Sequence, residues 1–192
     1  VVVKYVFGGG NAADVGTLDS DPDEDGNQMI RTNTNIFIEG GRFHQVIGGG
    51  NGEGGTPANI WGTANTTVYA GLIDEVYGGA NKTGDIDAIN LTMSNPGNSS
   101  LSSCTDQVYG KVFGCANAAH YNRSVTTNVL CGVGTIGELY GGSNQAFIGT
   151  DGQNNAHVTL NLYGGNYQKV FAGSKGVVDD PSTPLVNEEV AA

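Results

Sequence analysis

The chain has 192 residues, 32 of them glycine, and carries 8 Lys and Arg against 19 Asp and Glu, a formal net charge of −11 at pH 7. This negative field repels nucleic-acid phosphates and anionic membrane surfaces, so we expect no nucleic-acid partner. No apolar run is long enough to span a bilayer, so we expect no membrane insertion. Calcium, neutral glycans and basic protein surfaces remain compatible partners.

One six-residue motif recurs along the chain, and its first residues are separated by 40, 30, 36, 27 and 31 residues. A constant motif at variable spacing predicts one structural unit per copy, with insertions gathered in loops. The copies are VFGGGN (Val6–Asn11), VIGGGN (Val46–Asn51), VYGGAN (Val76–Asn81), VFGCAN (Val112–Asn117), LYGGSN (Leu139–Asn144) and a degenerate VFAGSK (Val170–Lys175).

Alternating apolar residues precede each copy, for example Ile36 with Ile38, and Ile89 with Leu91. A period of two in segments rich in Val, Ile and Thr predicts strands rather than helices. Glycine pairs such as Gly40–Gly41 separate two strands of one unit. We expect the glycines of the bends and turns to supply positive φ angles, with asparagine as the next best residue there.

Such units are expected to stack as the rungs of an all-β, single-stranded parallel β-helix (β-solenoid) of about six rungs, with loops inserted after the GGxN turn. Equivalent asparagines of successive rungs would then form a column in which side-chain amides hydrogen-bond one another. The predicted ladder consists of Asn11, Asn51, Asn81, Asn117 and Asn144.

On these turns and this asparagine column, the sequence resembles the right-handed parallel β-helix family, the pectin-lyase-like group that includes many bacterial surface and adhesin-like repeat proteins. The resemblance covers about residues 1–175. It implies an architecture but no particular activity, because such scaffolds host many functions. A β-sandwich or a propeller with glycine-rich hairpins is the alternative fold.

The first long insertion contains an acidic run, with five carboxylates between Asp19 and Asp25. Asp21, Asp23 and Asp25 followed by glycine match the opening of calcium-binding loops, in which alternate carboxylates converge on the ion. The bidentate glutamate of an EF-hand is missing, because Thr32 stands at that position. Two interpretations therefore remain: a calcium site, or a solvated acidic loop. No other cofactor is required by the sequence.

The insertion from Gly52 to Asn65 holds the only tryptophan, Trp61. On an exposed loop its flat ring is a candidate glycan contact. The alternative is that Trp61 folds back and packs over the body of the solenoid.

Residues 1–175 are expected to form the solenoid domain, and residues 176–192 an acidic linker or tail without the motif. The chain enters in the middle of a rung, so we expect a segment of a longer protein whose neighbouring repeats cover the exposed end rungs.

The three cysteines are Cys104, Cys115 and Cys131. Cys104 and Cys131 precede their motifs by the same number of residues, which makes a disulfide between adjacent rungs one option, and Cys115 replaces a turn glycine as a small buried side chain. The pairing is left open. The three histidines lack metal-ligand spacing, and no catalytic triad or phosphate loop is present.

These observations favour a non-enzymatic structural or adhesive segment of an exported bacterial surface protein, located extracellularly or on the cell surface, which displays loops on one flank for glycan or protein contact. The first alternative is a carbohydrate-active enzyme, a lyase or hydrolase, although no recurring carboxylate pair supports it. The second is a calcium-dependent glycan-binding module that uses the acidic loop and Trp61.

Overall fold

The computed structural model describes residues 2–17, 30–95, 106–149 and 156–176. These residues form nine strands and one short 3-10 helix (η1, Glu53–Gly55), so the described fold is all-β, as predicted. The strands are β1 (Val2–Phe7), β2 (Thr34–Ile47), β3 (Ile60–Tyr77), β4 (Ile86–Met93), β5 (Gln107–Phe113), β6 (Val125–Val129), β7 (Thr135–Tyr140), β8 (Val158–Leu162) and β9 (Asn166–Phe171).

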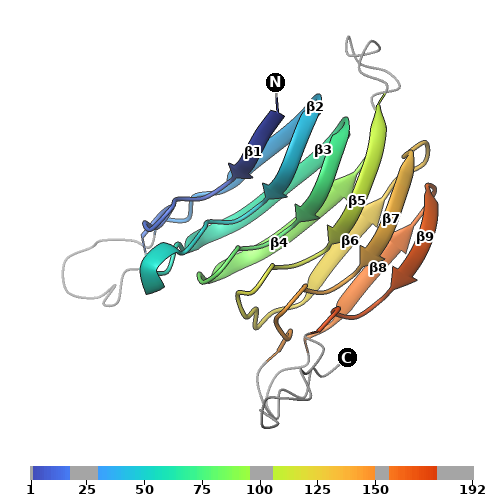
Figure 1. The fold of residues 1–192 in the computed structure, drawn as a ribbon. Helices are drawn as coiled ribbons and strands as arrows, with labels where there is room; N and C mark the ends of the chain where they lie inside the picture. Colours follow the sequence, from blue (N-terminus) through green and yellow to red (C-terminus); the bar gives the residue numbers. More distant parts are fainter. Residues whose placement is uncertain (1, 18–29, 96–105, 150–155, 177–192) are drawn as a thin grey trace, which may run out of the picture.

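Every pairing between these strands is parallel. Strand β1, the C-terminal halves of β2 and β3, and strands β5, β7 and β9 lie side by side and form what we call the groove sheet (Figure 1). The N-terminal halves of β2 and β3, with β4, β6 and β8, form the second sheet. The parallel strands thus curl into a half-barrel, and the antiparallel hairpins of the alternative folds do not occur among the described strands.

Strands β2 and β3 each continue from the second sheet into the groove sheet, and a glycine lies at the bend between the two halves of each strand. In β2, Gly41 has a φ of +108°, and in β3, Gly71 has a φ of +138°. These angles are in the region that favours glycine, so the predicted role of the bend glycines is confirmed.

The turn motif uses glycine for a different reason. Its first glycines do not have positive φ, and no described residue other than glycine has positive φ, so our expectation for the turn glycines and asparagines was wrong. A Cβ atom on Gly48 would lie 2.2 Å from the carbonyl oxygen of Gly78, and one on Gly78 would lie 2.2 Å from that of Gly114. Glycine is required because the backbones of successive repeats approach too closely for a side chain.

The predicted alternation of apolar residues forms the interior. Ile36, Val68, Leu91 and Val129 come from successive strands of the second sheet and are buried in one cluster with residues of the groove sheet, such as Val112. The core therefore lies between the two sheets, where the inward side chains of both meet.

An aromatic column lies beside this core. Tyr77, Phe113, Tyr140 and Phe171, each the second residue of a motif copy, stack with ring centroids 4.9, 5.0 and 4.9 Å apart. This spacing is close to the distance between neighbouring strands, about 4.8 Å, so the repeats stack in register here.

The insertions leave from two corners rather than one. The segments that join β1 to β2, β2 to β3, β3 to β4, β5 to β6 and β7 to β8 follow the turn motif, as predicted. Strand β4 instead ends at Met93 and β5 begins at Gln107, on the two sides of the bend between the sheets, so a second insertion interrupts the chain at that bend (Figure 1). No helix among the described residues has the length and apolarity needed to cross a membrane.

Candidate functional site

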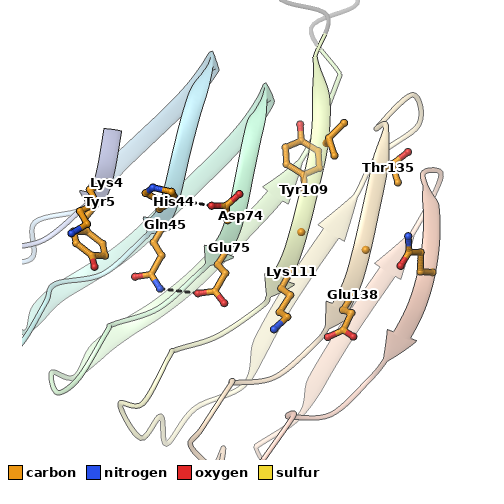
Figure 2. Close-up of a pocket in the computed structure, with 14 residues that line it drawn as sticks. Lys4, Tyr5, His44, Gln45, Asp74, Glu75, Tyr109, Lys111, Thr135 and Glu138 are labelled. Atoms are coloured by element: carbon orange, nitrogen blue, oxygen red, sulfur yellow. Dashed lines mark hydrogen bonds and ion pairs between the residues drawn. The ribbon is translucent and has the colours of Figure 1, made fainter. Parts of the chain in front are cut away.

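A groove of about 740 Å³ crosses the outer surface of the groove sheet (Figure 2). Its lining residues come from β1, β2, β3, β5, β7 and β9, so the groove runs across the strands and spans all six of them. A ligand that lay along it would contact equivalent positions of successive repeats.

Two rows of residues cross the groove sheet, because each strand has two adjacent residues that do not enter the core. All of these residues except Lys169 line the groove. The strand register aligns these residues across the sheet. The first row is Lys4, His44, Asp74, Gly110, Gly137 and Gln168, and the second row is Tyr5, Gln45, Glu75, Lys111, Glu138 and Lys169.

Two glycines in the first row leave a hollow in the surface of the sheet, because they have no side chains. Gly110 and Gly137 carry no side chain, and a Cβ atom on either would lie 2.4 or 2.5 Å from a carbonyl oxygen of the preceding strand. The backbone is therefore accessible at these two positions, between the side chains of Asp74 and Gln168.

One end of the hollow holds a histidine–carboxylate pair. His44 Nδ1 lies 2.6 Å from Asp74 Oδ2, and the two side chains are 49% and 56% exposed (Figure 2). A carboxylate at Nδ1 fixes the orientation of the imidazole and leaves Nε2 to exchange a proton with a bound ligand.

The second row alternates in charge. Glu75 pairs in register with Lys111, Lys111 with Glu138, and Glu138 with Lys169. Lys169 Nζ donates a hydrogen bond of 2.9 Å to Glu138, and this bond is the main cause of the lowered pKa of the Glu138 carboxyl. Opposite charges in register stabilise adjacent strands and hold these side chains in place.

The aromatic column anchors both glutamates of this row. Tyr77 OH donates to Glu75 over 2.9 Å, and Tyr140 OH donates to Glu138 over 3.1 Å. Burial, reinforced by the Glu75 charge, raises the pKa of Tyr77, so its hydroxyl remains a donor at neutral pH. Gln45 Nε2 also donates to Glu75, over 2.7 Å. The carboxylate oxygens are thus positioned before any ligand binds.

The predicted asparagine hydrogen bonds are present, outside the groove. Each side-chain amide donates to the carbonyl oxygen of the preceding asparagine, and Asn11 donates to Glu53 over 2.6 Å. The distances are 2.7 Å from Asn51 to Asn11, 2.7 Å from Asn81 to Asn51, 2.8 Å from Asn117 to Asn81 and 2.9 Å from Asn144 to Asn117.

Trp61 does not lie in a loop, because β3 begins one residue before it. Its indole nitrogen donates a hydrogen bond of 3.0 Å to Asp14, which also accepts from the backbone and side chain of Asn59. The side chain is half-buried and is not among the residues of the groove. Trp61 therefore lies in a strand rather than on an exposed loop, closer to the packed alternative, and its role as a glycan contact stays a prediction.

The proposed metal ligands Asp21, Asp23 and Asp25 lie outside the described residues, so the calcium site stays a prediction. Within the described ranges, no group of three His, Cys, Asp or Glu residues could hold a metal ion. Cys104 also lies outside these ranges, whereas Cys115 is buried and Cys131 is exposed, both as free thiols.

Sequence reasoning missed the groove as a site. The signal was available, because the groove residues are the first and second residues after the apolar position that precedes each motif copy. The alternation of charge becomes visible only when equivalent positions of successive repeats are compared, because a single repeat contributes one residue to it. Comparison with family models finds no match for this chain, and comparisons with curated proteins and with solved structures find none either.

Proposed function

We propose that this chain is a non-enzymatic segment of a parallel β-solenoid in an exported bacterial surface protein, and that its groove binds an extended neutral glycan. The observation that carries the proposal is the groove itself, which presents positioned polar groups from six strands in a row. Parallel pairing throughout, the aromatic column and the asparagine hydrogen bonds support the solenoid of about six rungs.

The chemistry of the lining favours a hydroxyl-rich ligand. Asp74, Glu75 and Glu138 accept hydrogen bonds, while Lys111 and Gln168 donate them. A sugar hydroxyl both donates and accepts, so it can pair with either kind of group. An anionic polymer is disfavoured, because carboxylates lie along the groove and the whole chain carries a net charge of −11.

The length of the groove favours an extended chain over a small molecule. Adjacent strands are about 4.8 Å apart, so six strands offer contacts over roughly 24 Å. A rigid sheet that repeats one polar pattern over this distance matches a polymer that repeats one sugar unit. The export and surface location are proposed from the family resemblance described above.

A glycan array followed by titration calorimetry tests this function. We expect a neutral glycan to bind, and Lys111→Ala to weaken it by about tenfold or more, because a hydrogen bond from a charged donor is worth roughly 1.5–3 kcal/mol. The matched control is Lys82→Ala, an exposed lysine that does not line the groove. Equal affinities of the two variants, or no glycan bound, would refute the proposal.

A carbohydrate-active enzyme remains the second candidate, and the His44–Asp74 pair favours it. With Nε2 of His44 as a general base that takes a proton from an attacking water, and with the departing sugar oxygen reprotonated from solvent, the groove would hydrolyse the glycan it binds. The discriminating experiment incubates the bound glycan with the protein and with His44→Ala. If the unmodified protein releases shorter fragments and His44→Ala does not, the chain is an enzyme and the non-enzymatic hypothesis is rejected.

A further inference from the structure

Four strands of the second sheet carry a regular array of asparagine and threonine on their outer face. Two outward residues of each strand, separated by one inward-facing residue, follow the pattern Asn-x-Thr or Thr-x-Asn in four neighbouring strands. The array is Asn65 and Thr67 in β3, Asn90 and Thr92 in β4, Thr126 and Asn128 in β6, and Thr159 and Asn161 in β8. None of these eight side chains is charged, in a chain whose net charge is −11.

The strand register places these residues in two straight rows. Asn65 pairs with Asn90, and Asn90 with Thr126, in the first row. Thr92 pairs with Asn128, and Asn128 with Asn161, in the second row. Positions in one row are about 4.8 Å apart, and the rows are about 6.6 Å apart, because alternate residues of a strand are separated by twice its rise. The polar groups therefore repeat in two dimensions (Figure 1 shows these strands side by side).

Hydrogen bonds within the rows fix the amide orientations. Asn65 Nδ2 donates to Asn35 over 3.2 Å, Asn90 Nδ2 donates to Asn65 over 3.0 Å, and Asn161 Nδ2 donates to Asn128 over 2.9 Å. Asn65 Nδ2 also donates to the backbone carbonyl oxygen of Thr34 over 3.5 Å. Each amide oxygen has a second lone pair that can accept a hydrogen bond from a partner. The side chains are thus ordered before contact, which lowers the entropy lost when a partner binds.

We propose that this face binds ice. An uncharged array of donors and acceptors that repeats in two dimensions fits a partner that is itself an uncharged, two-dimensional lattice of hydrogen-bonding oxygens. Threonine adds a methyl group beside each hydroxyl, so the face is partly apolar and its first water layer is ordered by a few fixed polar groups.

Other occupants fit the face less well. Its footprint is on the order of 250 Å² from the strand spacings, well below the roughly 800 Å² per partner of a stable protein interface. A crystalline polysaccharide would use a row of aromatic platforms, whereas the eight residues of the array include none and Phe37 of β2 offers one exposed ring beside them. A small contact area is sufficient for ice, because ice consists of water and water is always present at the surface.

Strand β2 interrupts the array and provides a gain-of-function test. Phe37 pairs in register with Thr67, at the position where the pattern requires threonine, and its ring is 60% exposed. Asn35 already continues the first row. Replacement of Phe37 by threonine would extend the array by one strand.

Thermal hysteresis and inhibition of ice recrystallisation by the purified chain test the proposal. We expect activity in the unmodified protein, higher activity in Phe37→Thr, and loss of activity in Thr92→Lys and Thr126→Lys, which place long charged side chains in the array. The matched control is Thr56→Lys, an exposed threonine that follows η1 and lies outside both the array and the groove, with circular dichroism to verify that all variants are folded.

The proposal is overturned if the unmodified protein shows no hysteresis, or if Thr56→Lys loses as much activity as Thr92→Lys. Retention of the protein by crystalline cellulose or chitin without any effect on ice would assign the face to a polysaccharide instead. Loss of glycan binding in groove variants would leave ice activity unchanged, so the two proposals fail independently.

Discussion

Gly114 and the carbonyl group of Gly141 in the next repeat are so close that a Cβ atom on Gly114 would lie 2.2 Å from the Gly141 oxygen. The same atom would lie 2.1 Å from Oγ1 of Thr127. The repeats can therefore stack at this distance only because the motif has glycine here.

We expect Gly114→Ala to lower the free energy of unfolding by about 3 kcal/mol, because overpacking against a backbone carbonyl cannot be relieved by a rotamer change. Urea unfolding followed by circular dichroism measures this loss. The control is Gly54→Ala, where a Cβ atom would meet nothing within 4 Å and only the φ of +65° is unfavourable. A loss in Gly54→Ala as large as in Gly114→Ala would contradict the steric explanation.

The asparagine hydrogen bonds should differ in their contribution to stability along the series. Asn81 is half-buried and bonds to asparagines on both sides, so Asn81→Ala leaves one donor and one acceptor without partners and is expected to lower stability by about 2 kcal/mol or more. Asn11 is exposed and water can replace its partners, so Asn11→Ala is expected to change stability by less than about 1 kcal/mol. Thermal and urea unfolding of the two variants provide the comparison. Equal losses of stability in the two variants would show that burial does not increase the contribution of the Asn81 hydrogen bonds.

Cys115 is expected to resist thiol reagents in the native protein. Its side chain is fully buried, and burial raises the pKa of the thiol to about 12, so almost no reactive thiolate forms at neutral pH. Cys131 is exposed and should react. Maleimide labelling with peptide mass spectrometry distinguishes the two sites. Labelling of Cys115 at the rate of Cys131 without denaturant would contradict the burial.

The same thiol makes stability depend on alkaline pH. Above 9.0, the ordinary thiol pKa, the unfolded chain loses a proton that the folded chain retains, so the free energy of unfolding falls as the pH rises. Cys115→Ala should reduce this fall, which urea unfolding between neutral and alkaline pH would detect. An unchanged slope in the variant would assign the alkaline loss entirely to other groups, such as Tyr109 and Tyr121, whose pKa values burial also raises.

Asp14 provides a spectroscopic test, because Trp61 is the only tryptophan. Burial raises the pKa of Asp14, but hydrogen bonds from Asn59 and Trp61 outweigh burial and lower the pKa below 3.8. The stability supplied by the ionised carboxylate is therefore present above the unfolded pKa and is lost as the pH falls through the lower folded value. Tryptophan fluorescence should titrate with a midpoint below 3.8, and Asp14→Asn should abolish that transition. A midpoint above 3.8 would contradict the hydrogen-bonded geometry.

The sequence predicted the all-β fold, the parallel stacking and the asparagine hydrogen bonds because each depends on a feature that recurs at fixed positions, such as Asn51 and Asn81. The sequence did not predict the features that depend on contacts between neighbouring repeats. The turn glycines are required by a neighbouring backbone, as at Gly48, and a single repeat carries no sign of that contact. Likewise Asp74 and His44 meet only because the register of β2 and β3 aligns them.

The parallel stacking of repeats is the claim on which the groove, the ladder and the array all depend. Nuclear Overhauser contacts of the Asn81 side-chain amide protons in an isotope-labelled sample test it most directly. We expect contacts to both Asn51 and Asn117, each one repeat away. Contacts to only one of them, or cross-strand Hα–Hα contacts of antiparallel hairpins, would contradict the stacked parallel arrangement.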